Sequence, residues 1–263
     1  MSSFVQLNGA TAIVTGAGSG IGRACAHAFS RRGSSVVVSD VNAQRADAVA
    51  AEIQDGGGHA VAQRCDVSNT AELELLREVA LSAFGRVDVV MNNVGVIAMG
   101  PPESLPLEQW QRVIDINLLG MVRSNLVFLP LLIEQGRGHL VNTASASGLL
   151  AHGYDRLPYV TTKHAVVGMS ESLALYLRPK GIGVTCLCPS GVVTNIMEQV
   201  TFFGEPVTPR SPDYPVVEAD VVGELVATAV TEGRFLVLTA PALHDELVDR
   251  TRDLDAYIAK HAT

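Results

Sequence analysis

Cysteine is scarce in this 263-residue sequence, which has four. Their spacing is not that of a secreted disulfide framework, because Cys186 and Cys188 are two residues apart and share one face of a predicted strand. The N-terminal segment lacks the charged region and long apolar run of a signal peptide. These absences predict reduced thiols and a cytoplasmic protein.

An apolar run of membrane-spanning length is also missing. Residues 118–133 come nearest, but Arg123, Asn125 and Pro130 interrupt them, and the run falls short of the ~20 apolar residues that a span needs. An excess of positive charge is absent too, since 19 Lys and Arg face 27 Asp and Glu, for a net charge of −8. That charge repels phosphate backbones and anionic lipids. We therefore expect neither nucleic acid nor a membrane as a partner.

What the sequence does contain is a regular alternation of short β-branched runs with longer helical patterns. The runs are nearly continuously apolar, as in parallel strands that helices cover on both faces. The predicted strands are residues 10–15, 35–40, 59–66, 87–93, 138–145, 183–189 and 234–240, and helices begin near Gly20, Ala43, Ala71, Leu107, Tyr159 and Glu218. This pattern predicts a single α/β domain over residues 1–263, with a doubly wound, seven-stranded parallel sheet.

One segment, residues 195–217, breaks this alternation. It holds four prolines together with Phe202, Phe203 and Tyr214, so we expect a loop without regular structure. It follows the sixth strand and therefore lies at the carboxyl edge of the sheet, where open α/β folds bind ligands. A substrate lid is the favoured interpretation, and an inert insertion is the alternative.

A glycine-rich turn, Thr15 to Gly22, follows the first strand and opens the first helix. Glycines let the backbone approach a pyrophosphate, and the helix N-terminus supplies free N–H donors. Asp40 ends the second strand, where a carboxylate accepts hydrogen bonds from the adenosine ribose and repels a 2′-phosphate. Ser19 and Val41 offer no cation to such a phosphate, so NAD is the predicted cofactor. Asp40 could instead cap the next helix.

Two further strand ends carry polar residues. Asp66 closes the third strand, where its carboxylate could take the adenine amino group or cap the following helix. Asn92 to Gly95 closes the fourth strand, and Gly95 would allow the chain to turn beneath the cofactor. Taken alone, this segment is only a turn signal.

Tyr159 and Lys163 are four residues apart near the start of a helical segment and therefore share a face. A cation about 4 Å from a phenol is worth about 4 kcal/mol at an effective dielectric of about 20, which would lower the pKa of the phenol from about 10 to about 7. That value suits a general acid/base at neutral pH. By itself, the Tyr-x-x-x-Lys spacing is common on solvated helix faces.

Ser145 ends the fifth strand, where its hydroxyl could hold a substrate oxygen, and Ser147 is its competitor. Asn117 lies within the preceding helical segment, a position that its propensity disfavours. A functional role and simple packing remain equally open for Asn117.

These motifs in this order closely resemble the short-chain dehydrogenase/reductase family over residues 8–195. The resemblance implies a catalytic tetrad of Asn117, Ser145, Tyr159 and Lys163. Tyrosine would exchange the proton, serine would polarise the substrate oxygen, lysine would lower the tyrosine pKa and bind the nicotinamide ribose, and asparagine would hold a water molecule. It further implies cofactor contacts from Gly16, Ser19, Gly20, Ile21, Asp40, Asp66, Val67, Asn93, Gly95, Tyr159, Lys163, Val192 and Thr194.

The sequence departs from the family pattern in three places. Val94 replaces an alanine, Pro189-Ser190-Gly191 replaces a Pro-Gly pair, and the tail after residue 238 is unlike the usual ending. The second departure weakens the assignments of Val192 and Thr194. No expectation is transferred to the tail.

Apolar residues that follow the catalytic strand ends predict a hydrophobic alcohol or ketone, steroid-like or lipid-derived, as substrate. The expected pocket walls are Val96, Ile97, Met99, Leu149, Leu150, Tyr154, Met197, Phe202 and Phe203. Rival functions are a 3-oxoacyl-thioester reductase and a non-catalytic dinucleotide sensor. A metal-dependent dehydrogenase is disfavoured, because histidines and cysteines form no ligand cluster along the sequence.

The resemblance also implies a homotetramer or homodimer built on the helices after Leu107 and Tyr159.

Overall fold

The fold is a parallel sheet of seven strands in the order β11-β7-β6-β4-β1-β2-β3. The computed structural model describes residues 4–205 and 214–262. The strands are β1 (Thr11–Thr15), β2 (Ser35–Asp40), β3 (Ala60–Arg64), β4 (Val89–Asn92), β6 (Gly138–Thr143), β7 (Ile182–Cys188) and β11 (Leu236–Leu238). All of their pairings are parallel. The predicted fold class is confirmed.

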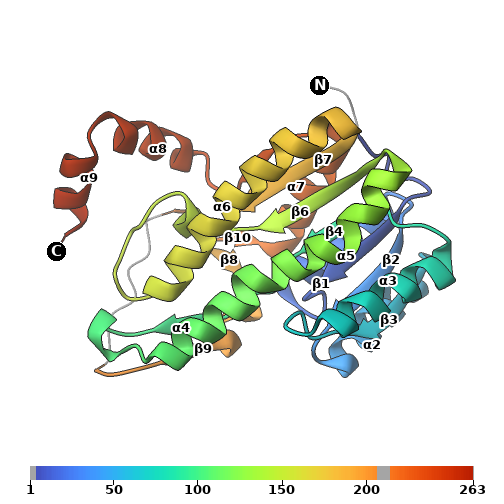
Figure 1. Cartoon of the computed structure of the whole chain (residues 1–263), viewed down its shortest axis with the longest axis horizontal. Helices are drawn as coiled ribbons and strands as arrows, with labels where there is room; N and C mark the ends of the chain where they lie inside the picture. Colours follow the sequence, from blue (N-terminus) through green and yellow to red (C-terminus); the bar gives the residue numbers. More distant parts are fainter. Residues whose placement is uncertain (1–3, 206–213, 263) are drawn as a thin grey trace.

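Helices cover both faces of this sheet (Figure 1). Helices α1 (Gly20–Arg31), α2 (Ala43–Asp55) and α7 (Ala219–Glu232) pack on one face, around Phe29 and Val38. Helices α3 (Thr70–Phe84), α5 (Gly120–Gln135) and α6 (Leu157–Leu177) pack on the other, around Phe128 and Leu140. The strands are buried from both sides, which explains why their sequences are nearly continuously apolar.

The long helical stretch of residues 107–135 is apolar enough to cross a membrane by length and composition. It consists of α4 (Leu107–Ile114), a π-helical turn η2 (Asp115–Leu119) and α5. Phe128 and Leu132 are fully buried, and α5 packs against α3. The stretch is therefore a core helix of the fold, which agrees with the expectation that it does not span a membrane.

The segment after β7 has more regular structure than we predicted. After β8 (Val192–Val193), a 3₁₀ turn η5 (Asn195–Gln199) leads into β9 (Val200–Phe202), which pairs with β5 (Ile97–Met99). Further on, β10 (Val217–Glu218) pairs with β8. Residues 206–213 of the predicted lid, with three of its four prolines, lie outside the described residues. The expectation of an irregular loop was wrong for residues 195–202, because that part contains no proline and has a partner strand.

The C-terminal tail forms two helices, α8 (Ala242–Arg252) and α9 (Leu254–His261). Leu243 and Tyr257 pack on Leu150, in the loop that follows β6. In Figure 1 the two helices extend to the left, away from the sheet. Three short 3₁₀ turns complete the fold: η1 (Pro102–Ser104), η3 (Ala146–Gly148) and η4 (Arg178–Lys180).

The strand order reverses between β1 and β4. The chain adds β2 and β3 on one side of β1, and then crosses to add β4, β6, β7 and β11 on the other. The carboxyl ends of β1 and β4 carry the glycine-rich turn and the Asn92 to Gly95 segment. In doubly wound sheets, such a reversal is where ligands bind.

Candidate active site

The glycine-rich turn has the backbone geometry of a phosphate cradle. Gly16 and Gly20 have φ angles of +63° and +51°, which disfavour residues with a side chain. A Cβ atom on Gly22 would lie 2.2 Å from the carbonyl oxygen of Gly16. Ser19 precedes helix α1, and its side chain does not cap the helix. The first N–H groups of α1 are thus left to a ligand, which fits the pyrophosphate of a dinucleotide.

Asp40 is bound to this turn. Its Oδ2 accepts a hydrogen bond from the Gly18 N–H at 3.0 Å, and its Oδ1 accepts one from the Asn42 N–H at 2.9 Å. The alternative that Asp40 caps helix α2 is wrong, because Asn42 is the cap and accepts from the Arg45 N–H. The carboxylate therefore stands beside the glycine turn, where the adenosine ribose is expected.

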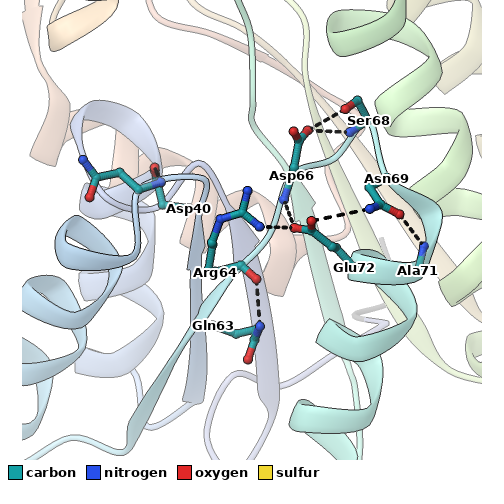
Figure 2. Close-up of polar contacts among 9 residues, drawn as sticks. Asp40, Gln63, Arg64, Asp66, Ser68, Asn69, Ala71 and Glu72 are labelled. Carbon is teal, nitrogen blue, oxygen red and sulfur yellow. Dashed lines mark hydrogen bonds and ion pairs between the residues drawn. The ribbon is translucent and has the colours of Figure 1, made fainter.

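Asp66 lies two residues after the end of β3, in a dense polar network (Figure 2). Its Oδ1 accepts hydrogen bonds from the Ser68 hydroxyl at 2.7 Å and from the Ser68 N–H at 2.9 Å, and these bonds lower the pKa of Asp66. Glu72 accepts from the Asp66 N–H and from Arg64, both at 2.7 Å. Asn69, rather than Asp66, caps helix α3. Asp66 Oδ1 is thus held toward Ser68 rather than toward the helix.

Asn93 and Gly95 continue the site across the strand reversal. The Asn93 N–H donates to the Thr15 hydroxyl at 3.1 Å, and its side chain donates to the Gly16 carbonyl at 3.3 Å. The Thr143 hydroxyl donates to Asn93 Oδ1 at 3.2 Å. Asn93 therefore links the glycine turn to the end of β6.

Lys163 is buried at this junction, with 2% of its surface exposed. Its Nζ donates to the Thr143 carbonyl at 2.7 Å. A Cβ on Gly95 would lie 3.6 Å from Lys163 Nζ and 3.8 Å from Asn117 Oδ1, so the three residues adjoin. Burial lowers the pKa of Lys163 to about 8, partly offset by the Cys188 and Cys186 thiols.

Asn117 holds the chain that leaves β4. Its Oδ1 accepts from the Val96 N–H at 2.8 Å, and its Nδ2 donates to the Val96 carbonyl at 2.9 Å. The residue is fully buried inside the π-helical turn η2. Asn117 is packed in the core and also fixes the backbone at Val96. A functional role and simple packing, the two interpretations left open from sequence, are therefore compatible.

Tyr159 and Ser145 meet at the carboxyl edge of the sheet. The Ser145 side chain is close enough to the Tyr159 phenol to lower its pKa. The Ser145 hydroxyl also accepts from the Ser147 N–H at 3.1 Å, so Ser147 supports Ser145 through its backbone. Lys163 Nζ lies 5.5 Å from the centre of the Tyr159 ring. All four predicted tetrad residues are thus brought together.

The prediction for the Tyr159 pKa was wrong. Burial raises the pKa of Tyr159 above its ordinary value, and the Ser145 side chain only partly lowers it. The sequence argument assumed a full ammonium charge next to the phenol oxygen. Instead, the Lys163 ammonium points to the Thr143 carbonyl and is itself destabilised by burial.

The remaining predicted cofactor residues border the same edge. Thr194 caps η5 and lies against the glycine turn, since a Cβ on Gly20 would be 3.0 Å from Thr194 Cβ. Ile21 and Val192 are partly buried against the core, and Val67 is buried three residues after the end of β3. The cofactor contacts of these residues stay a prediction.

Four of the expected pocket walls, Val96, Ile97, Met99 and Leu150, are buried core residues. Leu150 is fully buried under the C-terminal helices, and Val96 packs with Trp110 and Val113. Tyr154, Met197 and Phe202 are about half exposed, at 49%, 61% and 56%. The sequence could not separate these groups, because all of them are apolar residues that follow strand ends.

Sequence reasoning missed several residues that support the site. Thr143 contacts both Lys163 and Asn93, and Glu72 holds the Asp66 backbone. Thr143 could have been noticed from its position at the end of β6, two residues before Ser145. Glu72 could have been noticed from its position three residues after Asn69, the spacing of a helix capping box.

Comparison with known proteins agrees with this geometry. A family model described as short chain dehydrogenase matches residues 10–202. The cyclohexanol dehydrogenase of Acinetobacter sp. (strain SE19) is 36% identical over 196 residues, which cover 74% of this chain and 77% of that protein. The 1-deoxy-11-beta-hydroxypentalenate dehydrogenase of Streptomyces exfoliatus is 34% identical over 260 residues, 97% of this chain and 92% of that one.

A similar solved structure is that of a short chain dehydrogenase/reductase from Burkholderia phymatum in complex with NAD. It has a TM-score of 0.86 and 31% sequence identity, and the match covers 96% of each chain. The family match spans the glycine turn, the ends of β2, β3, β4 and β6, and helix α6 with Tyr159. This chain therefore belongs to the short-chain dehydrogenase/reductase family and is a dehydrogenase that acts on CH–OH groups with NAD(P).

Proposed function

We propose that this dehydrogenase uses NAD to oxidise a hydrophobic secondary alcohol, or to reduce the corresponding ketone, with Tyr159 as the acid/base. The observation that carries this proposal is the grouping of Tyr159 with the buried Lys163, whose Nζ lies 5.5 Å from the centre of the Tyr159 ring, next to Ser145. In the oxidation direction, Tyr159 accepts the hydroxyl proton while Ser145 holds the substrate oxygen. When bound, the nicotinamide supplies the hydride acceptor.

The glycine turn and the segment after β4 fit a dinucleotide. The residues that would contact the dinucleotide there are Gly16, Ser19, Gly20, Ile21, Asn93 and Gly95, together with Val192 and Thr194 after β7. Asp66 and Val67 would receive the adenine. Asp40 supports the choice of NAD, since its carboxylate stands beside Gly18 and would repel a 2′-phosphate. Lys163 would hold the nicotinamide ribose through Nζ, and Asn117 would orient the chain beneath it.

A hydrophobic substrate is supported by exposed apolar side chains beside the site. Met197 and Phe202 belong to the segment that pairs with β5, and both are more than half exposed. The name of the Acinetobacter relative specifies cyclohexanol, an apolar cyclic secondary alcohol. We propose that residues 195–217 form a lid over such a substrate. A 3-oxoacyl-thioester reductase remains the second candidate.

We also propose a homo-oligomer, tetramer or dimer, located in the cytoplasm. Leu126 on α5 and Leu175 on α6 are 70% and 80% exposed, which favours their burial between subunits. The single-domain organisation over residues 1–263 is part of the same proposal. Size measurement in solution would test the assembly.

The central test replaces Tyr159 with phenylalanine. The variant should lose about 10²-fold or more of kcat toward a panel of secondary alcohols, measured as NADH appearance, because a general acid/base contributes that much. NAD binding, measured by calorimetry, should persist. Tyr176→Phe, near the far end of the same helix, is the matched control and should retain activity. Equal turnover by Tyr159→Phe would refute the assignment, and absence of turnover in both wild type and variant would favour a dinucleotide sensor.

A further inference from the structure

The adenosine end of the proposed cofactor site contains a cation that the sequence analysis overlooked. Arg45 lies in the first turn of α2, close to Asp40 and Gly18. A Cβ on Gly18 would lie 2.6 Å from Arg45 Cβ and 2.8 Å from Asp40 Oδ2, so all three groups share one small space. The Arg45 side chain thus starts beside Asp40, and its guanidinium is the kind of group that binds a 2′-phosphate.

This guanidinium is already paired. Arg45 Nη2 lies 2.7 Å from Glu198 Oε2, in the η5 turn that follows the sixth strand of the main sheet along the chain. The other oxygen, Glu198 Oε1, accepts from the Asn195 side chain at 2.7 Å. Thr194, at the start of the same turn, lies against Gly20. The ion pair therefore joins the two sides of the glycine turn.

Arg64 is a second arginine near the adenosine end of the site, but its position is less suited to binding a phosphate on the ribose. Its guanidinium is held at 2.7 Å by Glu72, which also accepts from the Asp66 N–H (Figure 2). Glu72 and then Asp66 raise the pKa of Arg64, whereas Glu198 and, to a smaller extent, Asp40 raise the pKa of Arg45. Arg64 thus belongs to the adenine side, and Arg45 to the ribose side.

We propose that Glu198 is a cofactor-specificity residue, which acts by neutralising Arg45 next to Asp40. This inference rests on the proposed dinucleotide site. With Glu198 in place, the ribose position is lined by the Asp40 carboxylate and by a guanidinium whose charge is already balanced. A 2′-phosphate then meets net negative charge. Without Glu198, Arg45 is available as a partner for the phosphate, and the ratio of NADP to NAD affinity should rise.

The test compares the dissociation constants of NAD and NADP by calorimetry in four variants of the full-length protein. Glu198→Gln should raise the NADP-to-NAD affinity ratio about two- to fivefold, the range expected for an exposed ion pair. In an Arg45→Met background, Glu198→Gln should leave the ratio unchanged. The shift should also shrink at high salt, because the charges are exposed.

Glu52→Gln is the matched control. Glu52 lies on α2, the helix that carries Arg45, and is 42% exposed against 45% for Glu198; it pairs at 2.8 Å with Arg23 of α1 rather than with Arg45. Glu52→Gln removes the same charge as Glu198→Gln and should leave the NADP-to-NAD affinity ratio unchanged. An unchanged ratio in Glu198→Gln, or an equal shift in Glu52→Gln or in the Arg45→Met background, would overturn the proposal. A wild type that prefers NADP would contradict the proposed cofactor but leave this comparison of ratios intact.

Discussion

The buried ammonium of Lys163 should make the protein less stable at neutral pH than at alkaline pH. Lys163 is 2% exposed, and burial lowers its pKa to about 8 from an ordinary value of about 10.4. Between these two values the unfolded chain binds a proton that the folded chain does not. Stability therefore rises with pH through this window and is lowest below pH 8.

The expected size of this effect is about 3 kcal/mol, since each pH unit of difference between the two pKa values corresponds to about 1.4 kcal/mol. Lys163→Met removes the titrating group. It also removes the hydrogen bond to the Thr143 carbonyl, which costs about 1–3 kcal/mol but does not depend on pH. The informative quantity is therefore the pH dependence of the difference between the two proteins.

The measurement is urea unfolding of wild type and Lys163→Met at several pH values from 7 to 10, at one fixed protein concentration in case the protein is an oligomer. The free energy of unfolding of wild type, minus that of the variant, should increase by about 2–3 kcal/mol across this range. Lys260→Met, which removes an exposed lysine on α9, should give a flat difference. A flat or falling difference for Lys163→Met would refute the reasoning.

Two other substitutions test the cofactor site. Asp40→Ala should narrow or reverse the NAD-to-NADP ratio of kcat/KM, because it removes the carboxylate held by Gly18; an unchanged ratio would remove Asp40 from the specificity argument. Gly22→Ala should weaken NAD binding and lower stability by about 1–3 kcal/mol, since its Cβ would meet the Gly16 carbonyl at 2.2 Å. For Gly22→Ala, thermal unfolding would measure the loss of stability and calorimetry the loss of NAD affinity. Normal NAD binding by Gly22→Ala would show that the turn tolerates the methyl group.

The sheet and the positions of the site residues could be predicted because their signals are local. Apolar runs, glycine punctuation and strand ends are each encoded in a few consecutive residues. Asn42 and Asn69 were missed as helix caps because an aspartate stands a few residues earlier in each case, and sequence does not show which side chain turns toward the helix. The carboxylates of Asp40 and Asp66 make other bonds.

Long-range pairings could not be predicted. The β5–β9 ladder joins Ile97 to Val200, and the Arg45–Glu198 pair joins residues 153 positions apart. Each of these partners follows a different strand, and only the completed sheet brings their loops together. The packing of α8 and α9 on Leu150 is unforeseeable for the same reason.

The error about Tyr159 shows what a sequence argument leaves out. Spacing predicts which two groups meet, but the pKa of each depends on how much water the fold removes from both. Burial favours the neutral phenol of Tyr159 and the neutral amine of Lys163 alike. Near neutral pH, where Lys163 still carries its charge, Tyr159 is protonated and ready to donate a proton to a ketone oxygen. Alkaline pH should therefore favour alcohol oxidation, in which Tyr159 must accept a proton.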